Sequence, residues 1–325
     1  AETAGDAAVA QSQPMDVVSS YCAFRSVEIK PDTKGVARFH LNGKPLFVKG
    51  VLDQGYWPDG LMTAPDDEAL THDITAMKNA GFNMLRKHIK IESARWYYHC
   101  DRLGMLVWQD MVSGGGTYDG WETSYKPTLW RGSWGDYSDT SASHQRRLGA
   151  DDVAYQRQWM RECRGTVAHL RAHPSVVTWV LFNEGWGQFD ALACAEEVHL
   201  LDPTRPIDAV SGWYDQGVGD FQSVHNYFRP LQVYRDRRDL AGYARLAGGR
   251  AFAISEFGGV VHATAPSRAP TATGPPTRRP NGARRCAEHW IPRGPWRGRG
   301  FPPTCTRSCR TWKKSAMASS PTTGG

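Results

Sequence analysis

The sequence predicts an α/β protein whose main part is a TIM (β/α)8 barrel, in an incomplete form. From residue 41 onward, strand-like apolar runs alternate with helix-like amphipathic segments, which is the pattern of repeated βα units around a parallel sheet. Most of these runs end at polar residues, and the carboxyl ends of barrel strands form the ligand-binding mouth. The clearest run, residues 176–182, is mostly apolar, as in a strand buried on both faces, and leads directly into Asn183 and Glu184.

Two short segments precede the barrel. Residues 1–15 lack both a basic start and an apolar run, so we expect a disordered N-terminus and no signal peptide. Residues 16–40 are expected to form short strands around residues 31–35, which are rich in turn-forming types. We therefore place the barrel in residues 41–259.

Seven strands are expected within the barrel. Each is a short apolar run bounded by glycines or polar residues, and their repeated polar ends fit a barrel better than a doubly wound sheet. The expected strands are residues 46–51, 82–85, 105–108, 176–182, 207–210, 223–225 and 251–254.

Four helices are expected between these strands. The first begins at Pro65, with Asp66, Asp67 and Glu68 at its positive end, and stops near Gly81. Apolar residues recur at helical spacing in three further segments. These helices are expected at residues 92–103, 151–172 and 190–201, with a long loop at residues 113–149.

Residues 260–325 differ in composition from the rest of the chain. They carry ten Arg, two Lys and one Glu, a net charge of +11, although the whole chain carries +6. A basic arm of this kind can bind nucleic acid or anionic surfaces. A GC-rich gene translated in the wrong frame gives the same composition, and a shifted reading of residues 305–324 permits the segment YTQLSDVEEE. We favour a frameshift soon after Gly259, so that the tail is disordered, binds no nucleic acid and replaces the eighth strand.

The remaining composition argues against several kinds of site. Cys22, Cys100, Cys163 and Cys194 show no metal-ligand spacing and are expected to be buried thiols. No run reaches the roughly 18 apolar residues of a membrane span, and no zinc or phosphate-loop motif occurs. We expect no metal, no cofactor and no membrane partner, with a cytoplasmic location by default and the oligomeric state left open.

The polar residues at the strand ends define a candidate site. Two of them, Glu184 and Glu256, are carboxylates that each follow a buried strand. Hydrolysis of a glycosidic bond needs such a pair, because one group protonates the leaving oxygen while the other attacks the anomeric carbon or activates water. The full set is Asp53, Arg86, His88, Asp110, Asn183, Glu184, His225, Asn226, Tyr227 and Glu256.

The motifs around these residues resemble the barrel domain of glycoside hydrolase family 2, which contains β-galactosidases, β-glucuronidases and β-mannosidases. The matching motifs within residues 39–259 are LNGKPLFVKGV, GFNMLRKH, GMLVWQDM, VLFNEGWGQFD, DPTRP, SGWYD, SVHNY and ISEFGG. The resemblance implies that Glu184 is the general acid/base and Glu256 the nucleophile of a retaining β-glycosidase. It also implies that Asn183 binds the sugar 2-hydroxyl and that the two carboxyl groups lie about 5 Å apart.

The resemblance further implies substrate-binding roles for other residues of the mouth. Arg86 would keep Glu256 ionised, or would instead be the structural partner of Asp110. Tyr227 would lie beside the nucleophile, unless His225 takes that place. The tryptophans would be sugar platforms or would pack the rim. These aromatic candidates are Trp57, Trp186 and Trp213.

The chain also departs from the family pattern. Members usually carry a sugar-binding β-sandwich and an immunoglobulin-like domain before the barrel, and residues 16–40 resemble only the end of the latter. We predict a retaining β-glycosidase that hydrolyses O-glycosidic bonds of β-galactoside-like carbohydrates, with low or no activity in this chain because the eighth strand is missing. The alternative is a non-catalytic carbohydrate-binding protein, a degenerate glycosidase. Galactose is the default sugar.

Overall fold

The computed structural model describes residues 16–57, 60–135, 137–227, 248–258 and 314–316. The predictions of a disordered N-terminus at residues 1–15 and of a disordered tail concern residues that lie almost entirely outside this description.

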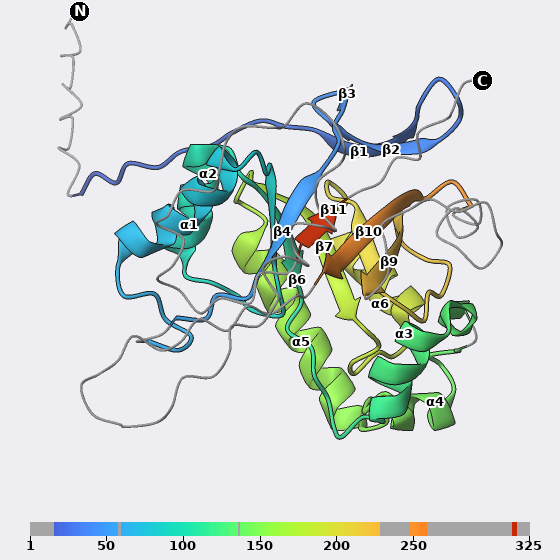
Figure 1. Ribbon diagram of the computed structural model, residues 1–325. Coiled ribbons are helices and arrows are strands. Elements are labelled where there is room, and N and C mark those ends of the chain that lie inside the picture. Colours follow the sequence, from blue (N-terminus) through green and yellow to red (C-terminus); the bar gives the residue numbers. More distant parts are fainter. Residues whose placement is uncertain (1–15, 58–59, 136, 228–247, 259–313, 317–325) are drawn as a thin grey trace, which may run out of the picture.

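An eight-stranded sheet in the described part of the chain confirms the predicted fold class, because seven of its strands run in the same direction (Figure 1). Neighbouring strands β4 to β8 pair in parallel, as do β9 and β10. Each of these seven strands overlaps a run expected from the sequence. The strands are β4 (Lys49–Asp53), β5 (Met84–Lys87), β6 (Leu106–Asp110), β7 (Val176–Asn183), β8 (Ile207–Ser211), β9 (Phe221–Tyr227) and β10 (Ala251–Gly258).

We expected the eighth strand to be missing, but a short strand occupies its place in the sheet. Strand β11 (Lys314–Ala316) lies between β4 and β10 and is antiparallel to both. In a complete barrel the eighth strand is parallel to its neighbours, and we expected it to be encoded in a shifted reading frame. The residues of β11 are instead those of the sequence as written. The edges of β4 and β10 otherwise present unpaired backbone groups, which an extended segment of either direction can satisfy.

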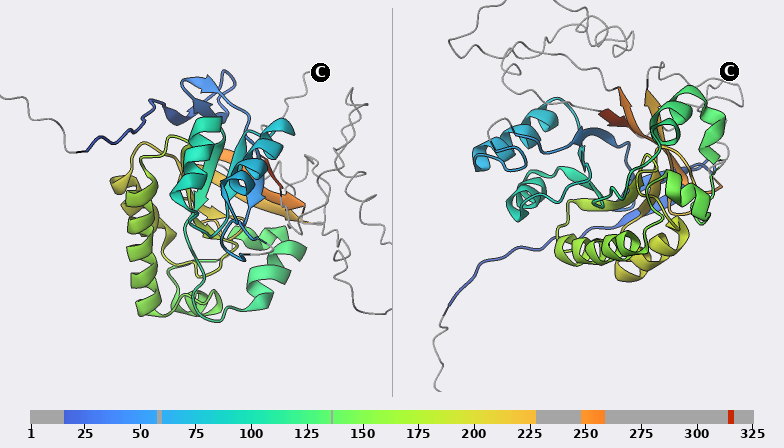
Figure 2. Two further views of the ribbon diagram at one scale, coloured as in Figure 1. Left: turned by 90° about the vertical axis from the view of Figure 1, so that its left-hand side faces the viewer. Right: turned by 90° about the horizontal axis from the view of Figure 1, so that it is seen from below.

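Four helices cover the outside of the sheet, as Figures 1 and 2 show. Their ends follow the predicted signals, since the Asp66 side chain caps the first helix at Ala69 N and Gly104 ends the second in a left-handed conformation. Their apolar faces and the outer faces of the strands form one core. The helices are α1 (Asp67–Asn79), α2 (Ala94–Leu103), α5 (Val153–Leu170) and α6 (Ala191–Leu201). No helix among the described residues has the length and apolar character to cross a membrane.

The prediction of a long loop at residues 113–149 was wrong, because the segment contains four short helical stretches. Buried Glu122 organises it by pairing with Lys126 at 2.9 Å and Arg147 at 3.1 Å. Its backbone carbonyl also accepts a hydrogen bond from the Tyr214 hydroxyl at 2.5 Å. The stretches are a π-helix (Trp121–Tyr125), α3 (Lys126–Leu129), a 3₁₀ helix (Arg131–Gly135) and α4 (Ala142–Arg147).

A small antiparallel sheet of β1 (Val27–Pro31), β2 (Ala37–Leu41) and β3 (Lys44–Pro45) precedes the barrel. Val27 and Phe39 pack with residues of the barrel interior, so the sheet covers the end opposite to α3 and α4 (Figure 1). The predicted strands of this segment are therefore present, and their descent from an immunoglobulin-like domain stays a prediction.

The cysteine prediction was wrong at one position. Cys100, Cys163 and Cys194 are buried free thiols, as expected, but Cys22 is exposed. It lies in the stretch before β1, where residues 16–26 form no helix or strand.

Candidate active site

The end of β7 holds Glu184 in a fixed backbone conformation. Its φ of 53° lies in the left-handed region, which is uncommon for a residue with a side chain. The turn is held on both sides, because Glu184 N donates to Ser211 O at 2.9 Å and Trp213 Nε1 donates to Glu184 O at 3.0 Å. A strained residue fixed in this way at a strand end is typical of functional sites.

Glu256 reaches the same mouth from β10. The pairing of β10 with β9 shifts register between Ile254 and Glu256, and such an irregularity re-aims a side chain. Glu256 stands opposite His225 after the shift and is completely buried.

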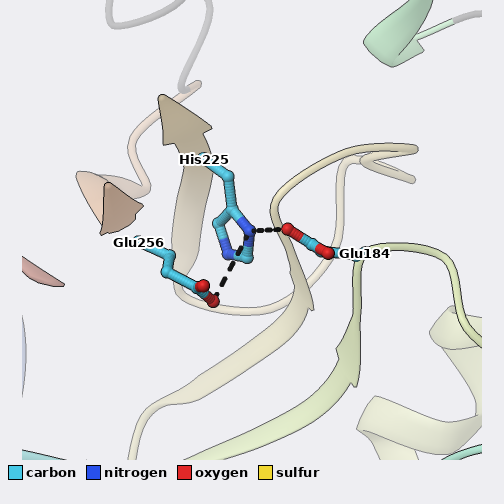
Figure 3. A group of neighbouring side chains, drawn as sticks. All are labelled: Glu184, His225 and Glu256. Carbon is cyan, nitrogen blue, oxygen red and sulfur yellow. Dashed lines mark hydrogen bonds and ion pairs between the residues drawn. The ribbon is translucent and has the colours of Figure 1, made fainter. Parts of the chain in front are cut away.

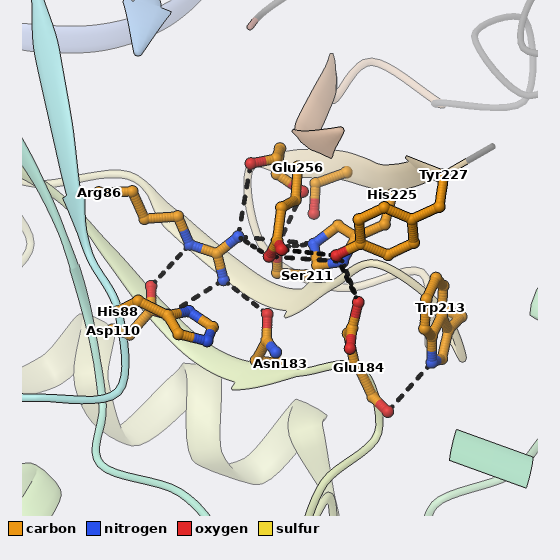
Figure 4. Close-up of polar contacts among 12 residues, drawn as sticks. Arg86, His88, Asp110, Asn183, Glu184, Ser211, Trp213, His225, Tyr227 and Glu256 are labelled. Atoms are coloured by element: carbon orange, nitrogen blue, oxygen red, sulfur yellow. Dashed lines mark hydrogen bonds and ion pairs between the residues drawn. The ribbon is translucent and has the colours of Figure 1, made fainter. Parts of the chain in front are cut away.

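Tyr227 joins the two carboxylates (Figure 4). Its hydroxyl lies 2.7 Å from Glu184 Oε1 and 2.5 Å from Glu256 Oε1. Burial and the two carboxylate charges hold the pKa of Tyr227 well above its usual value, so the phenol keeps its proton. The hydroxyl has one hydrogen for two acceptors, and both contacts are satisfied when one of the carboxyl groups carries a proton of its own.

His225 lies between the same two groups (Figure 3). Its Nδ1 is 2.8 Å from Glu184 Oε1 and 3.7 Å from Glu256 Oε2, while Nε2 is 3.0 Å from Ser211 Oγ. One ligand-type atom from each of the three residues lies within 4.8 Å of the others. A cation could use such a set, but the guanidinium of Arg86, 3.7 Å from Glu256 Oε2, disfavours further positive charge there.

Arg86 contacts both of the acids that the sequence offered as its partners. It binds Asp110 in a bidentate manner, with Nε–Oδ1 2.9 Å and Nη2–Oδ2 3.1 Å, and it lies 3.7 Å from Glu256. Burial is the largest single influence and would lower the pKa of Arg86, but the charge and hydrogen bonds of Asp110, together with the charge of Glu256, raise it. The pKa of Asp110 is lowered in turn despite its burial, by the charge of Arg86 and by a 3.0 Å contact with His88 Nδ1.

Asn183 contacts Arg86 through one half of its amide group. Its Oδ1 accepts from Arg86 Nη2 at 2.8 Å. The remaining amide nitrogen, Nδ2, is buried and has no hydrogen-bond partner among the described residues. A buried donor without a partner is costly, so this N–H group is available to a ligand.

The three predicted tryptophans lie in different surroundings. Trp213 is 2% exposed and meets His225 edge-on with a centroid distance of 5.4 Å. Trp186 is half-buried and stacks on Tyr118 at 6.1 Å. Trp57 is 7% exposed and belongs to the core between helices and sheet, so its contacts are those of a packing residue.

Sequence reasoning missed Ser211. Its hydroxyl contacts His225 Nε2 and Ser255 Oγ, at 3.0 and 2.8 Å, beneath the two carboxylates. The signal was available, because Ser211 is the first polar residue after the apolar run at 209–210.

Comparison with known protein families identifies the family of this chain. The family model described as "Glycosyl hydrolases family 2, TIM barrel domain" matches residues 33–244, more than half of the chain. The chain belongs to glycosyl hydrolase family 2. The matched range contains Glu184 and Tyr227, while Glu256 lies beyond it.

Two curated relatives of this family 2 chain are named β-galactosidase. The protein of Vibrio cholerae serotype O1 is 27% identical over 199 residues, which is 61% of this chain and 16% of the relative. That of Photobacterium profundum is 26% identical over 189 residues, which is 58% of this chain and 15% of the relative. The chain thus spans about a sixth of the length of these relatives.

A solved structure gives the same fold. The family 2 β-galacturonidase of Eisenbergiella tayi, bound to galacturonate, superposes with a TM-score of 0.55 at 19% identity, covering 77% of this chain and 41% of that one.

Proposed function

We propose that this family 2 barrel is a retaining β-glycosidase, with Glu256 as nucleophile and Glu184 as general acid/base. The observation that carries the proposal is the separation of the two carboxyl groups, which bring oxygens within 4.8 Å of each other. Retaining enzymes hold their carboxyl groups about 5 Å apart, whereas inverting enzymes need about 6.5–9.5 Å to admit a water molecule.

In the first step the Glu256 carboxylate attacks the anomeric carbon while the Glu184 carboxyl gives its proton to the departing oxygen. The contacts of Tyr227 are compatible with the required proton positions. If Tyr227 donates to Glu256, then Glu184 must carry the proton for its own contact with the phenol oxygen. Arg86, 3.7 Å away, favours the charged form of Glu256.

In the second step Glu184, now a carboxylate, takes a proton from water as the water oxygen attacks the anomeric carbon. The bond to Glu256 breaks, and the sugar leaves with its original anomeric configuration. The unpartnered Nδ2 of Asn183 is placed to donate to a sugar hydroxyl beside that carbon. Such a contact lowers the barrier if it strengthens in the transition state.

The substrate class we propose is a β-galactoside-like carbohydrate, because the curated relatives named above are β-galactosidases. One observation favours the non-catalytic alternative, in which the chain binds carbohydrate without hydrolysis. Among the described residues, the place next to β10 is held by the three-residue antiparallel strand β11.

The test is replacement of Glu184 by alanine. Hydrolysis of an alkyl β-glycoside is expected to fall about 10²–10⁴-fold, since that aglycone needs a proton to leave. A dinitrophenyl β-glycoside should lose much less in the first step, and added azide should restore turnover and give the β-glycosyl azide. These rates are measured from released aglycone, and the azide product is identified by NMR.

An equal loss for both substrates, without azide rescue, would contradict the acid/base role. If the unsubstituted chain hydrolyses neither substrate yet binds glycan by calorimetry, the carbohydrate-binding alternative holds.

A further inference from the structure

Asp208 is a buried acid that the proposed reaction does not use. It lies on β8 beside Val180 of β7 and is completely buried. Ser211, on the same strand, contacts His225 at 3.0 Å. Val180 packs with the residues of the barrel interior, so we place Asp208 in the interior as well.

Asp208 lacks the partners that stabilise a buried carboxylate. It forms no ion pair with any residue in the described parts of the chain, and Oδ2 has no hydrogen-bond partner there. Asp110, by contrast, is paired with Arg86, and Asp139 accepts from the Gln188 amide at 3.0 Å and from a backbone nitrogen. Burying a charge without such partners costs several kcal/mol.

The one polar contact of Asp208 fits the protonated form better than the charged form. Ser223 Oγ lies 2.7 Å from Asp208 Oδ1 and 3.1 Å from Val210 O. A carbonyl oxygen only accepts, so a charged Asp208 and Val210 O would have to share the single hydroxyl hydrogen. If Asp208 is protonated, it donates to Ser223 Oγ, Ser223 donates to Val210 O, and both contacts are satisfied.

The charges around Asp208 do not offset its burial. Burial is the main cause that raises the pKa of Asp208 to about 7, and the nearby charges of Asp110 and Asp215 act in the same direction. The Ser223 contact and the charge of Arg86 oppose the shift. Arg86, however, already forms ion pairs with Asp110 at 2.9 Å and with Glu256 at 3.7 Å.

We propose that Asp208 is neutral in the native protein and holds a proton in the barrel interior. In this state it does not compete with Asp110 and Glu256 for the positive charge of Arg86. When it ionises, it acts as a pH-sensitive element. The part of this proposal that concerns Glu256 rests on the proposed function. The neutral state of Asp208 does not.

The first test compares the stability of the unsubstituted chain with that of Asp208→Asn, whose amide can donate to Ser223 but cannot ionise. The unfolded Asp208 ionises near its ordinary value of 3.8 and the folded one near 7. Stability from this difference is fully present below about pH 4 and is lost as pH rises to about 7. The folding constant of the unsubstituted chain, relative to the variant, should fall about tenfold per pH unit in this range and then stay level.

Urea denaturation at a series of pH values measures this ratio. Glu196→Gln, the same chemical change at an exposed position of α6, is the matched control and should leave the pH dependence unchanged. Parallel curves for the unsubstituted chain and Asp208→Asn would overturn the proposal. If Asp208→Asn does not fold, infrared spectroscopy of Glu184→Gln, which lacks the proposed proton carrier of the active site, still decides, since a buried protonated carboxyl band must be present near pH 5 and disappear above about pH 7.

A second test follows hydrolysis of an aryl β-glycoside. The pH–activity profiles of the unsubstituted chain and Asp208→Asn should coincide at low pH and separate above about pH 7, where only the former gains a charge. Profiles that coincide throughout would overturn the link to Arg86 and Glu256. A chain without turnover would contradict the proposed function and leave the stability test intact.

Discussion

Replacement of Glu256 by glutamine is expected to reduce hydrolysis of an aryl β-glycoside by at least about 10⁴-fold. The amide has nearly the same shape and can still accept from Tyr227, but it does not ionise and cannot form the ester bond to the sugar. The measurement is kcat/KM from released aglycone, with thermal unfolding to verify that the variant is folded. Glu196→Gln, on the surface of α6, should retain full activity.

The alanine variant distinguishes a nucleophile from a residue that only supports the fold. In Glu256→Ala, azide can enter the space of the missing carboxylate and attack from the same side, which should give the α-glycosyl azide. Glu184→Ala should give the β-anomer, because azide then replaces the water of the second step. The same anomer from both variants would contradict the assignment of the two roles.

Replacement of Arg86 by methionine is expected to destabilise the protein by about 3–5 kcal/mol. Methionine fills much of the volume but leaves Asp110 and Glu256 as buried charges without their cation, and it removes the donor to Asn183 Oδ1. The free energy of unfolding is measured by urea denaturation at neutral pH. Arg164→Met is the matched control, because Arg164 is 55% exposed and its ion pair with Glu197 lies at the surface, where such pairs contribute about 0–1 kcal/mol.

A double substitution tests the cause of this loss. If the uncompensated charge of Asp110 is responsible, adding Asp110→Asn to Arg86→Met should recover part of the lost stability. A double variant that is less stable by the sum of the two single effects would show that lost packing, and not buried charge, dominates.

The strands and helices of the barrel were predictable because their signals are local. The run that ends at Asn183 is apolar on both faces, and Pro65 with its following acids marks a helix start. The segment at 113–149 was not predictable in the same way. Its helical turns depend on Glu122, whose partners include Arg147 and the distant Tyr214.

The candidate site also has features that the local sequence indicates and features that depend on tertiary contacts. Glu184 and Glu256 were recognisable because each comes at the end of an apolar run of the sequence, and the strand ends of a barrel share one mouth. The proposed neutral state of Asp208 was not recognisable, because it depends on which charged and hydrogen-bonding groups lie near its carboxyl group in space.

Local periodicity thus places the carboxylates at strand ends, but their chemistry depends on groups that are distant in sequence. Tyr227 is shared between acids 43 and 29 residues away. Arg86 must reach across the barrel to Asn183 and Glu256. Proton positions and charge balance follow Coulomb interactions and hydrogen bonds that act over a few ångströms of space, and those distances exist only once the sheet has curved into a barrel.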